Sequence, residues 1–383
     1  DNLSLCPEKP PNLKGKINVD MSSPRLEEIE AKYKDIMPGG HWRPKECKAR
    51  NKVAIVVPYR DRMNSLRSFL HHMHPFLQKQ QLDYAIFIVE QIGNFTFNKG
   101  KLTNIGIMEA LRVYPFDCII VHDVDTFPEN DNNLYTCSSD PNVAKHLSVF
   151  TQKNEYSDLY PEYIGSVIAL TVDQFKKING WSNDFWGWGG EDDDLSTRAK
   201  LANITFWRPE GDIPRYRSFE HEADEGNKPN DCRFEQLGHT ESNYLTDGFS
   251  NLNYRIESIN FGKLYTHIML FTTFSNSISI ITIFTLTIRT SCLIFNNTSL
   301  ITLHCMFVTL QYNQNSCLIC IAQPAHDNTG PRQLTKKYNE VECWNRLGIR
   351  IEIKRIIVIA NGAFILLDRY STTSSIKFYL EIK

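Results

Sequence analysis

A short run of aromatic residues, glycines and carboxylates holds the side chains best suited to chemistry. It reads Phe185-Trp186-Gly187-Trp188-Gly189-Gly190-Glu191-Asp192-Asp193-Asp194. Tryptophan rings offer flat faces to a ring-shaped ligand, and glycines let the backbone approach that ligand closely. A carboxylate beside apolar surface can have a pKa in the range useful for a general base. The alternative is a helix N-terminus whose acidic residues complement the helix dipole, although two tryptophans around a glycine make a poor cap.

A second pair of carboxylates, Asp123 and Asp125, follows the apolar segment Cys118-Ile119-Ile120-Val121. Two carboxylates one residue apart at a strand end can serve a ribose hydroxyl and a divalent cation. Mn²⁺ and Mg²⁺ prefer carboxylate oxygen and also bridge a diphosphate. His221 is a candidate for a further metal ligand. The alternatives are a loop-capping Asp-x-Asp and a structural histidine.

Basic and aromatic groups that could contact a nucleoside diphosphate lie in two other segments. The cations are Arg60, Arg62, Lys99 and Lys101, and the rings are Tyr59 and Phe97. A solvated helix start is the alternative for the two lysines.

Alternating strand and helix patterns would position these groups. Short apolar runs predict strands over residues 53–57, 84–89 and 118–121, and apolar spacing predicts helices over 64–80 and 101–113. This alternation predicts an α/β fold with a central, mostly parallel sheet. Ligands of such sheets bind at the carboxyl ends of the strands, where Pro58–Arg62 and His122–Asp125 lie.

Composition bounds the class of protein. The 383 residues allow one large domain or two, and the net charge of −2 gives no support for a nucleic-acid-binding surface. Ten cysteines, with possible glycosylation sites at Asn94, Asn203 and Asn297, indicate an oxidising secretory compartment. No signal peptide opens the sequence, so we expect any targeting segment to lie outside it.

The composition changes sharply after residue 263. From Leu264 to His326 the only formally charged side chain is Arg289. The uncharged run 268–288 is long enough to cross a bilayer, although its Ser, Thr and Asn residues make a poor span. A non-native tail, such as translated non-coding sequence, is the alternative for residues 268–383. The Cys317-Leu318-Ile319-Cys320 segment suggests a zinc knuckle, but buried or unpaired thiols fit its apolar surroundings better.

Several motifs in order give the chain a resemblance to the β-1,4-galactosyltransferase family (glycosyltransferase family 7) over about residues 6–267. The matching stretches are Gly39–Pro44, Val53–Arg62, Phe97–Gly106, His122–Asp125, Trp186–Asp194, Arg233-Phe234 and Asp247-Gly248. The resemblance implies a GT-A-like fold in three parts. These are an N-terminal lumenal segment (1–52), a catalytic domain (53–267) and an atypical tail (268–383).

The resemblance also implies an activity. It is the inverting, metal-dependent transfer of galactose from UDP-galactose to the 4-hydroxyl of terminal GlcNAc on glycoprotein or glycolipid glycans. The implied cofactor is Mn²⁺. The implied location is the Golgi lumen, as a type II membrane protein whose anchor lies in an N-terminal segment outside this sequence.

Individual roles carry over by position. Asp192 matches the catalytic base, and Asp125 and His221 match the Mn²⁺ ligands. Contacts to the UDP-sugar fall on Pro58, Arg60, Arg62, Phe97, Lys99, Asp123, Val124 and Lys153. Sugar and acceptor contacts fall on Trp188, Glu191, Asp193, Arg233, Phe234 and Leu237. Tyr163 matches the residue that crowds a 2-acetamido group, and the implied disulfides are Cys6–Cys47 and Cys118–Cys137.

Three positions depart from the family pattern. Ser218 replaces a Met or His metal ligand, which predicts weaker metal affinity or a preference for harder cations. Lys99 replaces an arginine and loses its planar fork. Ser166 replaces a glycine near the donor sugar.

Two other functions remain open on the sequence alone. One is the same fold with UDP-GalNAc as donor, against which Tyr163 argues. The other is a catalytically weakened, lectin-like relative, which Ser218 and the tail favour.

Overall fold

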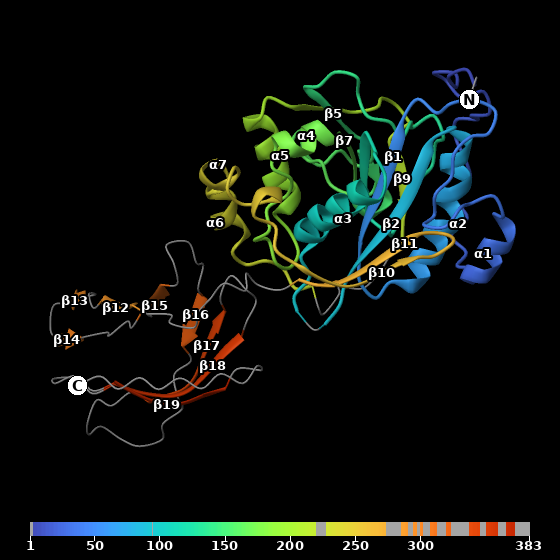
Figure 1. Ribbon diagram of the computed structural model, residues 1–383. Helices are drawn as coiled ribbons and strands as arrows, with labels where there is room; N and C mark the ends of the chain where they lie inside the picture. Colours follow the sequence, from blue (N-terminus) through green and yellow to red (C-terminus); the bar gives the residue numbers. More distant parts are fainter. Residues whose placement is uncertain are drawn as a thin grey trace. The chain divides into compact units, whose positions relative to one another are not determined.

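The computed structural model describes residues 3–93, 95–219 and 227–272, together with the backbone of the strands between residues 285 and 371. The chain divides into two compact units, Asp1–Ser275 and Asn276–Lys383 (Figure 1). The first unit holds every helix of the described residues.

An eight-stranded sheet forms the centre of the first unit, in the order β10-β11-β2-β1-β3-β7-β5-β8. Its strands are β1 (Lys52–Tyr59), β2 (Asp83–Gln91), β3 (Cys118–His122), β5 (Val143–His146), β7 (Val167–Thr171), β8 (Thr205–Trp207), β10 (Arg255–Phe261) and β11 (Thr266–Phe271). The neighbours β11, β2, β1 and β3 run parallel, while β10 and β7 are antiparallel to them. The predicted α/β class and the three predicted strands are confirmed.

Two helices explain why β1 is apolar on both faces. Val53, Ile55 and Val57 pack in one core cluster with α2 (Met63–Lys79), and Ala54 and Val56 pack in the other with α3 (Lys99–Val113). Figure 1 shows these helices on opposite sides of the sheet. A strand covered on both faces has no polar alternation, which accounts for the continuous apolar run. The two predicted helices are confirmed to within two residues at each end.

Smaller elements surround this sheet. The helices are α1 (Leu26–Lys32), α4 (Val172–Lys177), α5 (Glu191–Leu201), α6 (Arg233–Gly238) and α7 (Thr240–Asn243), with 3₁₀ turns η1 (Gln152–Asn154) and η2 (Phe249–Asn251). A three-stranded sheet is formed by β4 (Thr126–Pro128), β9 (Arg215–Ser218) and β6 (Phe150–Thr151), in that order.

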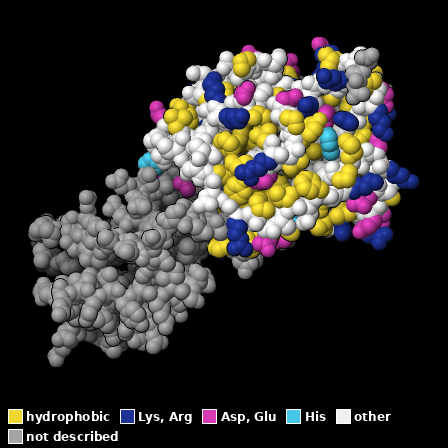
Figure 2. All heavy atoms as spheres, in the orientation of Figure 1, with side chains coloured by type: hydrophobic (Ala, Val, Ile, Leu, Met, Phe, Trp, Pro, Cys, Tyr) yellow, Lys and Arg dark blue, Asp and Glu magenta, His cyan; other side chains and the backbone are white. Residues whose placement is uncertain are grey.

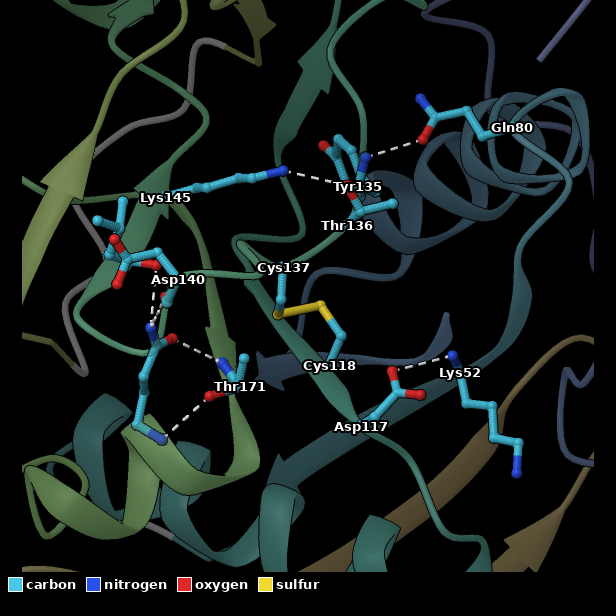
Figure 3. Close-up of a disulfide and its surroundings, with 12 residues drawn as sticks. Lys52, Gln80, Asp117, Cys118, Tyr135, Thr136, Cys137, Asp140, Lys145 and Thr171 are labelled. Carbon is cyan, nitrogen blue, oxygen red and sulfur yellow. Dashed lines mark hydrogen bonds between the residues drawn. A yellow bond between two sulfur atoms is a disulfide. The ribbon is translucent and has the colours of Figure 1, made fainter. Parts of the chain in front are cut away.

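The N-terminal segment packs on this unit. Val19, Ile29, Tyr33 and Ile36 join the core cluster that contains α2. One disulfide joins Cys6 to Cys47 and another joins Cys118 to Cys137, the pairs that the resemblance implied. Figure 3 shows the second bond tying the start of β3 to the segment that carries Tyr135 and Thr136.

The second unit is described only as antiparallel strands, which form two two-stranded sheets and one four-stranded sheet. Its strands are β12 (Thr285–Arg289), β13 (Ile294–Asn296), β14 (Ser299–Ile301), β15 (Phe307–Gln311), β16 (Ile319–Ala322), β17 (Lys337–Trp344), β18 (Arg350–Val358) and β19 (Ile365–Ser371). Cys317 of the zinc hypothesis lies outside the described residues.

The run 268–288 is not a helix where the structure describes it. Residues 268–271 belong to β11, which pairs with β2 of the central sheet, and residues 285–288 belong to β12. Residues 273–284 lie outside the described residues. Within the described residues, no helix combines the length and apolar character needed to cross a membrane.

Candidate active site

A cavity of about 560 Å³ opens at the carboxyl ends of β1 and β3. Predicted site residues from five segments meet there. They are Pro58, Arg60, Arg62, Phe97, Lys99, Asp123, Val124, Asp125, Lys153, Tyr163, Trp188, Glu191, Asp192 and Asp193. The lining also includes Asn154, Leu159, Tyr160, Ser166, Gly187, Gly189, Gly190 and Asn227. The cavity therefore lies where the predicted alternation of strands and helices places it, at the carboxyl ends of the parallel strands.

The glycine-rich run forms both a helix start and a wall of the cavity. Helix α5 begins at Glu191, and Gly190 precedes it with a φ of 98°. A Cβ at Gly190 would lie 2.6 Å from the Phe185 ring, so both the backbone angle and the space require glycine. The two interpretations of the acidic run are thus compatible, because the first turn of α5 faces the cavity.

The fourth carboxylate of the run has a different role. Asp194 is buried and accepts hydrogen bonds from Arg198 Nε at 2.5 Å and from Thr240 Oγ1 at 2.7 Å. It fixes α5 against α7 and does not line the cavity. Only the first three acidic residues of the run are therefore available to a ligand.

Lys99 is the central cation of the cavity. Its Nζ lies 3.2 Å from Asp123 Oδ1, 3.4 Å from Asp192 Oδ2 and 3.8 Å from Glu191 Oε1. Burial disfavours its charge, but these three carboxylates outweigh burial and hold the Lys99 pKa well above its ordinary 10.5. Lys153 Nζ lies 3.5 Å from Asp123 Oδ2. Burial raises the Asp123 pKa, yet Lys99 and Lys153 together bring it below its ordinary value.

Asp192 and Glu191 have raised pKa values, whereas that of Asp123 is lowered. Burial raises the pKa of Asp192, and the opposing charge of Lys99 does not cancel that effect. Burial, with the charge of Asp192, raises the pKa of Glu191 to about 7. A buried carboxylate with a raised pKa, open to a cavity, is a competent proton acceptor.

Asp125 and Ser218 supply oxygen atoms suited to a hard cation. Ser218, the last residue of β9, pairs with Thr126, and the Phe219 amide donates to the Asp125 carbonyl at 3.1 Å. The Ser218 hydroxyl is buried and has no hydrogen-bond partner among the described residues. Arg62 Nη1 lies 3.3 Å from Asp125 Oδ2. The backbone pairing places Ser218 next to Asp125 in the sheet, although only Asp125 lines the cavity, and a buried hydroxyl oxygen is a donor type that a hard divalent cation accepts.

The metal site is incomplete within the part of the chain that the structure describes. His221 lies outside it, and the described residues contain no group of three or more His, Cys, Asp or Glu arranged to hold a metal ion. Of the predicted metal ligands, Asp125 lies within the described residues and lines the cavity.

Trp188 is an exposed aromatic ring that lines the cavity, whereas the predicted acceptor residues Arg233, Phe234 and Leu237 are not among its lining residues, although Arg233 packs near Gly189 and Gly190. Trp188 is 62% exposed and Phe234 is 71% exposed. The Trp188 amide donates to the Lys228 carbonyl, and the Asn230 amide donates to the Trp188 carbonyl, each at 2.9 Å. The Arg233 guanidinium lies 4.6 Å from the Phe234 ring centre, and half-buried Leu237 follows in α6. These rings suit the apolar face of a sugar.

The loop before β7 contributes residues that sequence reasoning missed. Tyr160 donates from its hydroxyl to Asp193 Oδ1 at 2.6 Å. A Cβ at Gly165 would lie 2.3 Å from the Tyr163 hydroxyl oxygen and 2.9 Å from Asp192 Oδ2. The loop therefore brings Tyr163 close to Asp192. Nothing in its irregular sequence signals these contacts.

Two residues suggested for a nucleoside diphosphate, Lys101 for its phosphates and Tyr59 for its base, lie elsewhere. Lys101 is buried in α3, and burial lowers its pKa to about 8. Tyr59 is buried in β1 and accepts from the Arg62 amide at 3.1 Å. Neither lines the cavity, so both assignments are wrong.

Comparison with known proteins agrees with this geometry. Residues 6–138 match the family model described as the N-terminal region of glycosyl transferase group 7, and residues 145–222 match the one described as the N-terminal domain of galactosyltransferase. β-1,4-Galactosyltransferase 3 of Bos taurus and of Homo sapiens are each 46% identical over 267 residues, covering 70% of this chain and 67% of theirs. β-1,4-Galactosyltransferase 4 of Cricetulus griseus is 45% identical, covering 70% of this chain and 76% of its own.

Solved structures agree as well. The catalytic domain of Drosophila β-1,4-galactosyltransferase 7 in complex with xylobiose matches with a TM-score of 0.50 and 31% identity, over 58% of this chain and 93% of that one. A mutant of that enzyme, in complex with manganese, UDP-Gal and xylobiose, matches with a TM-score of 0.50 and 30% identity over the same shares. The chain belongs to the β-1,4-galactosyltransferase family and is a glycosyltransferase with a GT-A-like fold.

Proposed function

We propose that the chain transfers galactose from UDP-galactose to the 4-hydroxyl of a terminal GlcNAc, with inversion and with a divalent cation, Mn²⁺. The observation that carries this proposal is Asp192, a half-buried carboxylate of raised pKa that faces a cavity lined by cations and aromatic rings. Relatives named β-1,4-galactosyltransferase and a solved relative that binds manganese and UDP-Gal support the donor and the cation.

The donor would lie along the ends of β1 and β3. Arg60, Arg62 and Lys153 line this part of the cavity and offer positive charge to a diphosphate. The Arg60 guanidinium lies 5.0 Å from the centre of the Phe97 ring, which can border the uracil. Pro58, Val124 and Asp123 complete the walls around the nucleotide and sugar.

Inversion needs one direct displacement at the anomeric carbon. The acceptor hydroxyl approaches from the side opposite the departing diphosphate, and Asp192 takes its proton. A cation held by Asp125 and Ser218, with His221 as a further ligand, would neutralise charge on the leaving diphosphate. No covalent nucleophile is required, because a base and a stabilised leaving group suffice.

The remaining side chains would select the sugars. Tyr163 beside Gly165 leaves little room for a 2-acetamido group on the donor, which favours galactose over GalNAc. Glu191 and Asp193 offer hydrogen-bond acceptors to sugar hydroxyls, and Trp188 offers a flat face. The acceptor's N-acetyl group would lie near Arg233, Phe234 and Leu237.

We propose that the protein acts in the Golgi lumen as a type II membrane protein. Two disulfides in the first unit suit an oxidising compartment. The face shown in Figure 2 mixes both signs of charge, in keeping with the small net charge. Such a surface suits a glycan or nucleotide-sugar partner better than nucleic acid.

The test compares wild-type protein with Asp192→Asn, using UDP-galactose, Mn²⁺ and a GlcNAc acceptor. We expect the substitution to lower kcat by about 10²- to 10⁴-fold, as for loss of a general base, while UDP-galactose binding stays within a few-fold. Asp173→Asn, the same change at an exposed position of α4, is the matched control and should leave kcat unchanged. Full activity in Asp192→Asn would remove this residue from its role.

Two panels decide between the remaining functions. Transfer rates with UDP-galactose and UDP-GalNAc decide the donor, and rates with GlcNAc and xylose acceptors decide the acceptor, since the solved relative binds xylobiose. Binding of UDP-galactose without turnover, even at high Mn²⁺, would favour the lectin-like alternative.

A further inference from the structure

Arg208 holds the loop before β7 through four contacts. Its Nη1 lies 3.1 Å from Asp158 Oδ1. Its Nη2 donates to the carbonyl oxygens of Tyr160 at 3.2 Å, Pro161 at 2.6 Å and Tyr163 at 2.6 Å. Guanidinium is the side-chain group that offers several N–H donors in a fixed plane, so it can bind several acceptors at once.

The loop has little structure of its own at this point. It runs from η1, which ends at Asn154, to β7, which begins at Val167. Within residues 158–163 the structure describes one backbone hydrogen bond, from the Tyr163 amide to the Tyr160 carbonyl. The contacts from Arg208 therefore supply most of the described polar restraint on this stretch.

The restrained stretch carries two rings of the active site. Tyr160 reaches Asp193, and the Tyr163 ring packs edge-on against Tyr160 at 5.5 Å and against buried His146 at 5.8 Å. The Tyr163 hydroxyl lies beside Gly165 and Asp192. A shift of the loop backbone would therefore move Tyr163 relative to the sugar and the base.

We propose that Arg208 is a positioning residue that sets donor-sugar selectivity through Tyr163. It is not among the residues that line the cavity, so it acts through the loop rather than on a ligand. The inference rests on the proposed function, because it assigns the space beside Tyr163 to the substituent at carbon 2 of the donor sugar. When Arg208 holds the loop carbonyls, the Tyr163 ring stays in that space. When the loop is loosened, the ring can move away and a donor sugar with a larger substituent can bind.

The experiment measures the ratio of kcat/KM for UDP-GalNAc to that for UDP-galactose in wild type and Arg208→Lys. Lysine keeps the charge but cannot reach three carbonyls and a carboxylate together. We expect the ratio to rise about tenfold, because displacements near 1 Å change rates by one to two orders of magnitude. Thermal unfolding and circular dichroism identify any general loss of fold.

A matched control comes from Arg215, whose guanidinium lies 3.8 Å from the centre of the Tyr156 ring at the start of the same loop. Arg215→Lys should leave the ratio unchanged. Asp158→Ala removes one exposed contact of the four that Arg208 makes to the loop. It should raise the ratio about twofold with the fold intact. An unchanged ratio in both Arg208→Lys and Asp158→Ala, or an equal rise in Arg215→Lys, overturns the inference.

A double-mutant cycle tests the route. In a Tyr163→Leu background, adding Arg208→Lys should change the ratio no further, since the crowding ring is gone. If the effects of Arg208→Lys and Tyr163→Leu on the ratio are additive, Arg208 does not act through Tyr163. A wild-type protein that transfers neither sugar would refute the proposed function, whereas an active wild type with an insensitive ratio refutes only the role of Arg208.

Discussion

Lys99 Nζ lies 3.4 Å from both carboxylate oxygens of Asp192. The lysine is the first residue of α3 and the aspartate is the second residue of α5, so two helix starts meet at the cavity. Burial raises the Asp192 pKa, and Lys99 opposes that rise. The pair therefore sets how strong a base Asp192 is and at which pH it is ionised.

Replacing Lys99 by Met should move the acidic limb of the kcat–pH profile to higher pH by about one unit. Removal of the positive charge raises the Asp192 pKa further, so the base stays protonated, and inactive, to a higher pH. Rates at saturating donor over pH 4 to 9 provide the measurement. Lys99→Arg keeps the charge and should leave the limb near its wild-type position. If the acidic limb of the kcat–pH profile does not move in Lys99→Met, the lysine does not set the pKa of Asp192.

Glu191 should make folding stability depend on pH. Its folded-state pKa is about 7 against an ordinary 4.5, so folding favours the protonated acid. This contribution is fully present below about pH 4.5 and is lost as pH rises through 7. Glu191→Gln should therefore match wild type at low pH and exceed its free energy of unfolding by about 1–3 kcal/mol at pH 8.

Denaturant unfolding of both ligand-free proteins at pH 4.5, 6, 7 and 8 measures this difference. Glu162→Gln, at an exposed position of the loop before β7, serves as control and should show no such divergence. A constant difference between wild type and Glu191→Gln across these pH values would contradict the raised pKa.

Gly165→Ala should lower kcat/KM by about 10²-fold with modest loss of stability. The added Cβ would lie 2.3 Å from the Tyr163 hydroxyl oxygen and 2.9 Å from Asp192 Oδ2, so one or both side chains must move. Gly238→Ala, whose Cβ would meet nothing within 4 Å, is the control. Adding Tyr163→Phe removes the nearer clashing atom and should restore part of the activity. Steady-state kinetics measure kcat/KM for these variants. Wild-type activity in Gly165→Ala would mean that the close approach of Gly165 to Tyr163 and Asp192 is not needed for catalysis.

The sequence predicts best where the signal is local. The strand ends and the first turn of α5 lie within short runs whose composition already combines apolar strands, glycines and carboxylates. Lys101 illustrates the limit, because two residues along a helix turn a side chain by about 200°, away from the cavity that Lys99 lines. Tyr160 and Arg208 could not be predicted, since their contacts join segments separated by dozens of residues without any motif.

Ser218→His should strengthen Mn²⁺ binding by about tenfold and reduce the relative effect of Mg²⁺. The serine hydroxyl is buried with no partner among the described residues, Ser218 pairs with the residue that follows Asp125, and hydroxyl oxygen binds Mn²⁺ less strongly than imidazole does. Calorimetric or paramagnetic-resonance titration measures binding directly, and the half-activating metal concentration in the transfer assay should follow it. Ser242→His at an exposed position of α7 is the control for adding an imidazole. Micromolar half-saturation of the wild type, unchanged in Ser218→His, would show that this hydroxyl does not weaken the site.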